Sequence, residues 1–105
     1  MNNNKLASLL GLAQKAGKLV SGETAVEQAI RKRKTDLVFL ASDATINCQK
    51  NYENMTKYYS VPLYKIFSKE EMGNIIGKSP RAVVAVTDRG FCDGMVKLLQ
   101  DSSDG

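Results

Sequence analysis

Two unbroken apolar runs limit the fold of this chain more than any other feature. Leu37–Ala41 and Ala82–Val86 are apolar throughout, without alternation. A strand with one face in water alternates apolar and polar residues, so an unbroken apolar run indicates a strand that is covered on both faces. The sheet must therefore lie between two layers of helices.

Amphipathic segments between these runs supply the covering layers. Leu6, Leu9, Leu10 and Ala13 stand at positions i, i+3, i+4 and i+7, which form one apolar stripe of a helix. The same reasoning predicts four more helices, with apolar stripes within Ala25–Ile30, Cys48–Tyr59, Met72–Ile76 and Phe91–Leu99, and short strands at Lys18–Val20 and Pro62–Ile66.

Local signals mark the ends of these helices. Ser68–Glu71 is a capping box, in which the serine oxygen accepts from the fourth residue's amide and the glutamate reaches back. Polar residues or glycines before the other stripes predict N-caps, and glycines after them predict left-handed stops. The expected N-caps are Ser21 or Gly22 for the second helix and Ser42 or Asp43 for the third, and the expected stops are Gly17 and Gly77.

Helices and strands thus alternate along the chain, beginning and ending with a helix. This order predicts an α/β fold, a three-layer α/β/α sandwich around a mixed sheet of about four strands. A chain of 105 residues favours one compact domain over two. We expect a single domain over residues 1–100 and a flexible acidic tail over residues 101–105.

The cysteines and two tyrosines are expected in the core. Cys48 and Cys92 are far apart in the sequence and form no Cys-x-x-Cys arrangement, which excludes a disulfide framework and a four-ligand zinc site. Tyr52 and Tyr59 share the stripe of the third helix with Met55, so burial is favoured over stacking on nucleic acid.

Positive charge gathers in the first two thirds of the chain. The sequence has 15 basic and 11 acidic side chains, a net charge of +4 and a pI near 9.1. Residues 1–65 hold ten basic and five acidic side chains, whereas the tail holds two acids and no base. This balance permits a polyanionic partner without requiring one. The run Arg31–Lys34 has an equally good structural explanation, because cations stabilise a helix C-terminus.

The chemistry that the sequence lacks excludes most enzymes. Histidine is absent, which removes the commonest general base, the commonest metal ligand and every Ser-His pair. Gly77–Ser79 resembles the end of a P-loop, but Met72 stands where that motif needs a glycine, and Pro80 breaks the following helix. A receiver-like domain would use Asp43, but Lys18–Glu23 lacks its magnesium-binding acidic pair. We expect no enzyme activity, no metal ion and no cofactor.

No segment has the pattern of a membrane span or an export signal. The sequence has no run of 18 apolar residues, and Met1–Lys5 leads into an amphipathic pattern. We therefore expect a cytoplasmic protein without a membrane partner.

Two polar loops remain that solubility alone does not explain. The first runs from Lys15 to Thr24 and combines glycines with a helix start, where free amide groups favour phosphate. The second runs from Gly77 to Ala82, directly before the last strand. If the two strand segments that adjoin these loops are neighbours in the sheet, we expect the loops to form one continuous binding edge.

A succession of segments gives the chain a specific resemblance. These segments are Leu10–Glu23, Lys34–Asp43, Val61–Leu63, Ser68–Gly73 and Ile76–Val86. From about Lys5 to Leu99 the chain resembles bacterial members of the L-seven-Ae/L-thirty-e family of ribosomal proteins. The resemblance implies an α/β/α sandwich that associates with the ribosome and binds kink-turn RNA, a helix bent at an internal loop flanked by sheared G·A pairs.

The resemblance also implies a base-reading segment. Family members read the kink with Gly-x-Asn-Glu-x-x-Lys at the start of the second helix, and Val20–Val26 corresponds to it here. Glu23 matches the glutamate and is expected to accept hydrogen bonds from guanine. Gly22 replaces the asparagine and Val26 the lysine, although a two-residue shift would bring Gln28 or Arg31 near the lysine's place. Losing this lysine costs about 1–3 kcal/mol of base discrimination.

The other implied contacts reach the RNA backbone and an extruded base. Gly22 allows close approach of the protein backbone, the segment Lys78–Ala82 packs on the extruded nucleotide, and Arg81 contacts a phosphate or stacks on that base. Lysines and arginines near the loops contact phosphates. The expected RNA-binding residues are Lys15, Lys18, Ser21, Gly22, Glu23, Thr24, Arg31, Lys32, Lys78, Ser79, Pro80, Arg81 and Ala82, with Lys15, Lys18, Arg31 and Lys32 on phosphates.

A second function is left open by the sequence. The same scaffold would serve as a protein-interaction adaptor if its basic edge bound an acidic protein. Neither function uses a small-molecule substrate. RNA binding predicts an affinity that falls steeply with salt and a preference for a kinked loop over a plain duplex, and the adaptor predicts neither.

Overall fold

The computed structural model describes residues 3–103, in which helices and strands alternate as predicted. In chain order the elements are α1 (Asn3–Lys15), β1 (Leu19–Ser21), α2 (Glu23–Arg31), β2 (Leu37–Leu40), α3 (Ile46–Tyr59), β3 (Leu63–Lys65), α4 (Lys69–Ile76), β4 (Val83–Val86) and α5 (Arg89–Ser103). Helix α5 includes the first three residues of the expected tail, and residues 104–105 lie outside the described part.

The four strands form one mixed sheet in the order β1-β4-β2-β3. β4 runs antiparallel to both of its neighbours, whereas β2 and β3 are parallel. The two apolar runs form the central strands, which pair from Leu37 opposite Val86 to Leu40 opposite Val83, and every residue of both strands is buried. The predicted mixed sheet with doubly covered central strands is confirmed.

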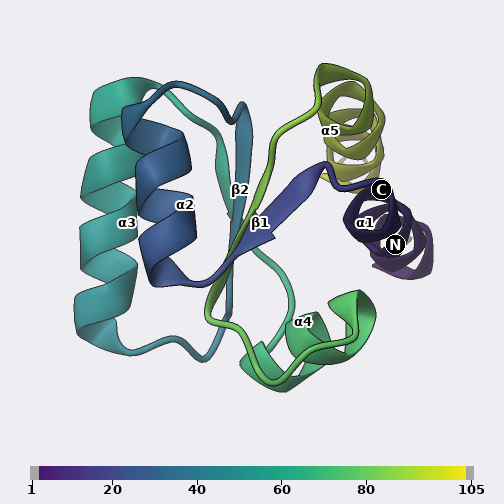
Figure 1. Cartoon of the computed structure of the whole chain (residues 1–105), viewed down its shortest axis with the longest axis horizontal. Coiled ribbons are helices and arrows are strands. Elements are labelled where there is room, and N and C mark those ends of the chain that lie inside the picture. Colours follow the sequence, from purple (N-terminus) through teal and green to yellow (C-terminus); the bar gives the residue numbers. More distant parts are fainter. Residues whose placement is uncertain (1–2, 104–105) are drawn as a thin grey trace.

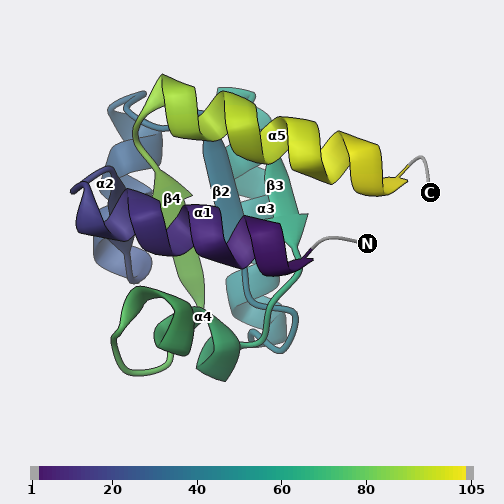
Figure 2. The ribbon, with the colours of Figure 1, turned by 90° about the vertical axis from the view of Figure 1, so that its right-hand side faces the viewer.

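Helices cover both faces of this sheet. α2 and α3 pack side by side on one face, and α1, α4 and α5 lie on the other (Figures 1 and 2). The buried positions of α1 are Leu6, Leu10 and Ala13, as the helical spacing predicts. The three-layer α/β/α architecture is therefore confirmed. Among the described residues, no helix has the length and apolar character needed to span a membrane.

Most predicted helix ends are confirmed. Ser68 and Glu71 form both hydrogen bonds of the capping box at the start of α4. Gly17 after α1 and Gly77 after α4 adopt left-handed backbone conformations, with φ of 71° and 72°. Gly22, one of the two candidates, is the N-cap of α2.

The predicted N-cap of α3 is wrong. The helix begins later, and the side chain of Thr45 accepts from the Cys48 amide, 3.2 Å away. Asp43 instead accepts a hydrogen bond from the backbone amide of Lys69 through Oδ1, at 2.9 Å. A short turn, closed by the Ala44 amide and the Ala41 carbonyl, separates the strand from the helix. Asp43 therefore stabilises the start of α4, which follows it by 26 residues.

The expected core residues are buried. Cys48 and Cys92 are both buried and free. Tyr52 is fully buried, and Tyr59 is half-buried against the core. The interpretation of these two tyrosines as packing residues is therefore confirmed.

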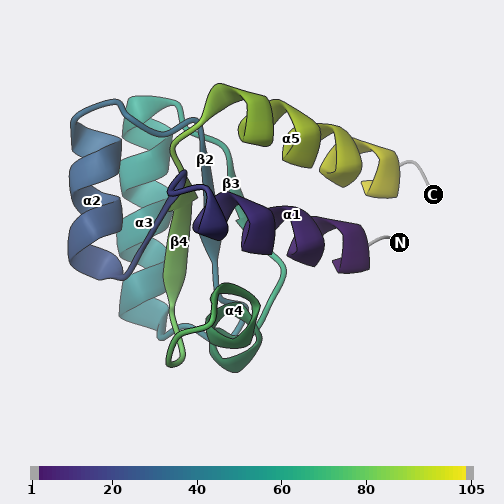
Figure 3. The same ribbon diagram turned by 45° about the vertical axis from the view of Figure 1, so that its right-hand side comes forward.

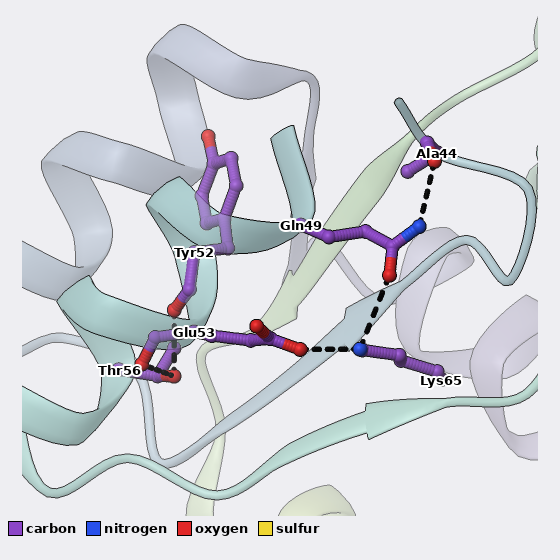
Figure 4. Close-up of polar contacts among 6 residues, drawn as sticks. All are labelled: Ala44, Gln49, Tyr52, Glu53, Thr56 and Lys65. Atoms are coloured by element: carbon purple, nitrogen blue, oxygen red, sulfur yellow. Dashed lines mark hydrogen bonds and ion pairs between the residues drawn. The ribbon is translucent and has the colours of Figure 1, made fainter. Parts of the chain in front are cut away.

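Polar side chains of α3 cover the edge strand β3. Lys65 Nζ donates to Glu53 Oε2 and, at 3.2 Å, to Gln49 Oε1 (Figure 4). Gln49 in turn donates to the Ala44 carbonyl at 2.8 Å. These bonds tie the edge of the sheet to the start of α3, so that β2, β3 and α3 are held in one arrangement.

Candidate nucleic-acid interface

The start of α2 is shaped by a glycine. Gly22 has φ 92° and ψ 154°, a backbone conformation that residues with a Cβ rarely adopt. Its amide donates to the Val83 carbonyl of β4 at 3.0 Å, and its carbonyl accepts from the Val26 amide. No side chain caps the helix. The first amide groups of α2 therefore lack a side-chain acceptor and carry the positive end of the helix dipole, which favours an anion such as phosphate.

The backbone of Glu23, the first residue of α2, is hydrogen-bonded to a buried tyrosine. The Tyr52 hydroxyl of α3 donates to the Glu23 backbone carbonyl at 2.8 Å. Burial and the nearby Glu23 carboxylate raise the pKa of Tyr52 far above its usual value, so the hydroxyl stays protonated and remains a donor. The carboxylate side chain is exposed. The helix start is thus fixed by the core while its acceptor oxygens face outward.

The thiol of Cys48 also lies close to Glu23. Burial raises the pKa of this thiol to about 11, and the Glu23 carboxylate contributes to the rise. A neutral thiol adds no competing charge beside the carboxylate. Two groups that stay neutral at physiological pH, the Cys48 thiol and the Tyr52 hydroxyl, therefore lie close to Glu23.

The second loop packs directly on α4. Lys78 donates from its backbone amide to the Gly73 carbonyl at 2.8 Å. Gly73 is buried, and a Cβ there would lie 2.5 Å from the Ser79 carbonyl oxygen and 2.8 Å from the Lys78 oxygen. The Arg81 amide donates to the Lys69 carbonyl at 3.1 Å. Close packing on a glycine thus fixes the path of this loop. Figure 3 shows the loop running from α4 into β4.

Arg81 joins the two loops. Its Nε donates to Ser21 Oγ, 3.3 Å away at the end of β1. Its Nη1 donates within the second loop, to Ser79 Oγ at 2.6 Å, the Ser79 carbonyl at 3.0 Å and the Pro80 carbonyl at 3.3 Å. Arg81 therefore has a structural role that the sequence did not indicate, and within the described chain its Nη2 group has no such partner.

The expected continuous edge exists in part. β1 and β4 are neighbours, and the bonds of Gly22 to Val83 and of Arg81 to Ser21 bring the end of the first loop beside the end of the second. Lys15 lies at the end of α1 and lines, with Gly77, a groove of about 660 Å³ between α1 and α4. Lys15 therefore lies beside the start of the second loop. Ser21–Thr24, Lys78–Ala82 and Lys15 are called the Glu23 edge below.

Three predicted phosphate contacts lie away from this edge. The strand β1 divides the first loop, and the Lys18 carbonyl accepts from the Thr87 amide at the opposite end of the strand. Arg31 and Lys32 lie at the far end of α2, about 12 Å from Glu23 at a rise of about 1.5 Å per residue. Arg31 pairs there with Glu27 at 3.2 Å. The positive charge is thus distributed over two ends of the molecule.

Two contributors to the site were missed at the sequence level. The spacing of Tyr52 predicts its place in the core, but its hydrogen bond to α2 depends on how the two helices pack. Gly73 carries no local signal, since it lies inside a helix and contacts a loop that follows the helix. Among the described residues, no group of three or more histidine, cysteine or acidic side chains could hold a metal ion.

A family model and two similar proteins agree in what they indicate about this chain. Residues 4–96 match the model of the ribosomal protein L7Ae/L30e/S12e/Gadd45 family. The chain is similar to proteins called "RNA-binding protein YlxQ", with 39% identity to that of Enterococcus faecium and 46% to that of Bacillus subtilis. The alignments cover 94% and 87% of this chain, and 95% and 91% of those proteins.

Solved structures share the same fold. A protein with unknown function from Bacillus halodurans superposes with a TM-score of 0.87 and 35% identity, over 91% of this chain and 97% of that chain. A Giardia lamblia protein described as a 15.5kD RNA binding protein gives a TM-score of 0.82 over 94% of this chain and 85% of that chain. Its identity is 19%, so this likeness concerns the fold alone.

Proposed function

The chain belongs to the ribosomal protein L7Ae/L30e/S12e/Gadd45 family, and from this premise we propose that it is an RNA-binding protein that recognises kink-turn RNA through the Glu23 edge. The observation that carries the proposal is the bond between Arg81 and Ser21, which holds the two loops side by side next to an N-terminus without a side-chain cap. An edge of this kind offers an acceptor for bases and donors for phosphates.

Each part of the edge has a role in this proposal. The Glu23 carboxylate accepts hydrogen bonds from guanine, and the backbone at Gly22 approaches the RNA closely. The segment Lys78–Ala82 packs on an extruded base, while Lys15 contacts phosphate. Lys18, Arg31 and Lys32 then belong to the RNA stem beyond the kink, because they lie farther from Glu23.

In this proposal Gln28 or Arg31 takes over part of the role of the missing family lysine. Val26 is fully buried and faces the core, so it does not contact RNA. Gln28 is exposed on the same helix, beside Lys32 in a groove between α2 and β1. An amide at this place can hydrogen-bond a base but carries no charge, so we expect weaker base discrimination than a lysine would give.

A binding assay with matched RNAs tests this proposal. The full chain is titrated with a kink-turn RNA and with the same RNA whose G·A pairs are made Watson–Crick. We expect tighter binding to the kinked RNA, and a log affinity that falls with log salt by about 0.7–0.9 per contacted phosphate. Equal binding to both RNAs would contradict kink recognition, and no binding at low salt would contradict RNA binding.

The role of Glu23 needs its own variant. Glu23→Ala should lose about 1–3 kcal/mol of the preference for the kinked RNA, because the guanine donors lose their acceptor. Asp93→Ala is the control, since Asp93 is an exposed carboxylate on α5, behind the opposite face of the sheet. An unchanged preference in Glu23→Ala would remove this residue from the base-reading role.

We further propose that the protein acts in the cytoplasm in association with ribosomes and without a catalytic step. Its family membership supports this placement. Sedimentation of the protein with ribosomal particles through a sucrose gradient tests the association. Failure to co-sediment at low salt would contradict it.

A further inference from the structure

The end of the molecule opposite the Glu23 edge carries a second surface, of which the proposed kink recognition uses Arg31 alone. α2 and α3 run in the same direction, so both end there, at the top of Figure 1. Arg31 and Arg33 come from the end of α2, and Tyr58 and Tyr59 come from the end of α3. These four residues are called the α2–α3 surface.

The two tyrosines differ in their surroundings. Tyr59 is half-buried and packs on the core, whereas Tyr58 is 78% exposed, more than any other large hydrophobic residue in the described chain. Their ring centroids are 4.9 Å apart and their planes meet at 76°. Tyr59 therefore supports Tyr58 edge-on, and the Tyr58 ring is presented to solvent.

Arg33 occupies a backbone conformation that favours glycine. Its φ is 56°, and in the same chain the turns after α1 and α4 use Gly17 and Gly77 for left-handed positions. After α3 a serine, Ser60, takes the left-handed position at φ 59°, so a glycine is not required there. An arginine at such a position is still less favourable than a glycine, and a contact of its side chain can offset this cost. The Arg33 guanidinium lies 5.1 Å from the Tyr59 ring centroid, within the range of a cation–π contact.

A groove of about 470 Å³ runs along this surface. It is lined by Arg31, two asparagines, Met55 and the two tyrosines. Arg31 forms an ion pair with Glu27, and the charges of these two side chains cancel. Arg33 and the neighbouring Lys32 and Lys34 make no ion pair among the described residues, so the surface is positive overall.

We propose that the α2–α3 surface binds an unpaired stretch of RNA, with one base stacked on Tyr58 and the flanking phosphates beside Arg31 and Arg33. A nucleotide matches both parts of the surface, because each one carries an aromatic face and a negative charge. An acidic peptide would match the cations but would leave the exposed ring without a partner. The inference rests on the proposed function in one respect, namely that the ligand is RNA.

Binding of a single strand by the full chain tests this assignment. The probe is a fluorescein-labelled oligouridine of ten nucleotides, which forms no stable duplex, followed by fluorescence anisotropy. Tyr58→Ala should weaken binding about 5- to 150-fold, the range for loss of one base–aromatic stack. Tyr58→Phe should bind like the unmodified chain, because it keeps the ring. Ile46→Ala is the control, since Ile46 is 69% exposed at the other end of α3.

Arg33→Gly separates binding from folding. Glycine relieves the left-handed backbone, so the melting temperature should stay the same or rise, while the affinity for oligouridine falls. A purely structural role of Arg33 would instead lower the melting temperature and leave the affinity unchanged. That result would overturn its part in binding.

The outcomes for the two surfaces are distinguishable. Tyr58→Ala should not change binding of a blunt-ended kink-turn RNA, and Glu23→Ala should not change binding of oligouridine.

If oligouridine does not bind at low salt, or binds Tyr58→Ala like the unmodified chain, the inference is overturned even where kink recognition holds. Binding of poly-glutamate with the same dependence on Tyr58 would overturn it in favour of a protein partner. Tyr58-dependent binding of oligouridine without kink preference would support it and contradict the proposed function alone.

Discussion

A methyl group at position 73 should displace the second loop of the Glu23 edge. In Gly73→Ala the new Cβ would meet three backbone atoms, the nearest of them the Ser79 oxygen at 2.5 Å and the Ser79 carbon at 2.7 Å. Backbone atoms cannot rotate away as a side chain can. The loop must therefore move off α4, which strains the bonds of Arg81 to Lys69 and Ser21.

Two opposing effects set the change in stability of Gly73→Ala. Alanine is better than glycine inside a helix by up to about 1 kcal/mol. Overpacking of a filled site costs about 1–3 kcal/mol. Gly94→Ala isolates the first effect, because Gly94 lies within α5 and its added Cβ would have Leu9 Cδ1 as nearest neighbour at 3.8 Å, an ordinary contact.

The comparison between these two alanine variants is the measurement. Gly73→Ala should be less stable than Gly94→Ala by about 1–3 kcal/mol, the overpacking cost alone. At about 4–8 °C for each kcal/mol in a domain of this size, thermal unfolding followed by circular dichroism resolves the difference. Affinity for kink-turn RNA should fall in Gly73→Ala and stay unchanged in Gly94→Ala.

Equal melting temperatures would refute the reasoning. They would mean that the loop moves away from α4 at no cost, so that close packing on Gly73 does not fix its path. A stability loss with unchanged RNA affinity would confirm the packing argument and remove the second loop from the interface.

Three further predictions follow from the contacts around α3. Tyr52→Phe should lose about 0.5–1.5 kcal/mol of stability, since its hydroxyl is the buried donor to α2, whereas Tyr58→Phe should lose nothing measurable by urea unfolding. Thr45→Ala should cost about 1 kcal/mol as the loss of an N-cap, and Ser42→Ala close to zero; the opposite order would restore the N-cap expected from the sequence. The pKa of Cys48 is raised from 9.0 to about 11, so the folded state holds this proton more tightly than the unfolded state. Its contribution to stability is full below pH 9 and is lost as the pH rises toward about 11, and Cys48→Ala should reduce this slope in unfolding measurements between pH 8 and 10.5.

The parts of the fold that depend on local pattern were predictable. The runs at Leu37 and Val83 could only form covered strands, and Ser68 and Gly77 mark the ends of α4 by hydrogen bonds within a few residues. The N-cap of α3 was not predictable in the same way. Asp43 is a good capping residue by composition, but its partner is an amide of α4, and only the packed structure brings α4 to it.

The candidate site was likewise predictable where it depends on local pattern, and not where it depends on tertiary packing. Both loops could be selected from their glycines and charges, and pairing of β1 with β4 brings them together. The direction of that pairing decides which residues meet, and it puts Ser21 beside Arg81 but Lys18 beside Thr87. Antiparallel register is a tertiary property, so the sequence pattern alone placed Lys18 and Glu23 in one loop.

β1 spans three residues and is bonded to its neighbour beyond both ends, through Gly22 to Val83 and through Lys18 to Thr87. Successive side chains of a strand point to opposite faces, so one inserted or deleted residue would turn Ser21 away from Arg81 and move Gly22 off Val83. The segment between α1 and α2 is therefore constrained in its length as well as in its composition. Substitutions at other positions of this segment leave Ser21 and Gly22 in register. An insertion or a deletion would instead separate the two loops.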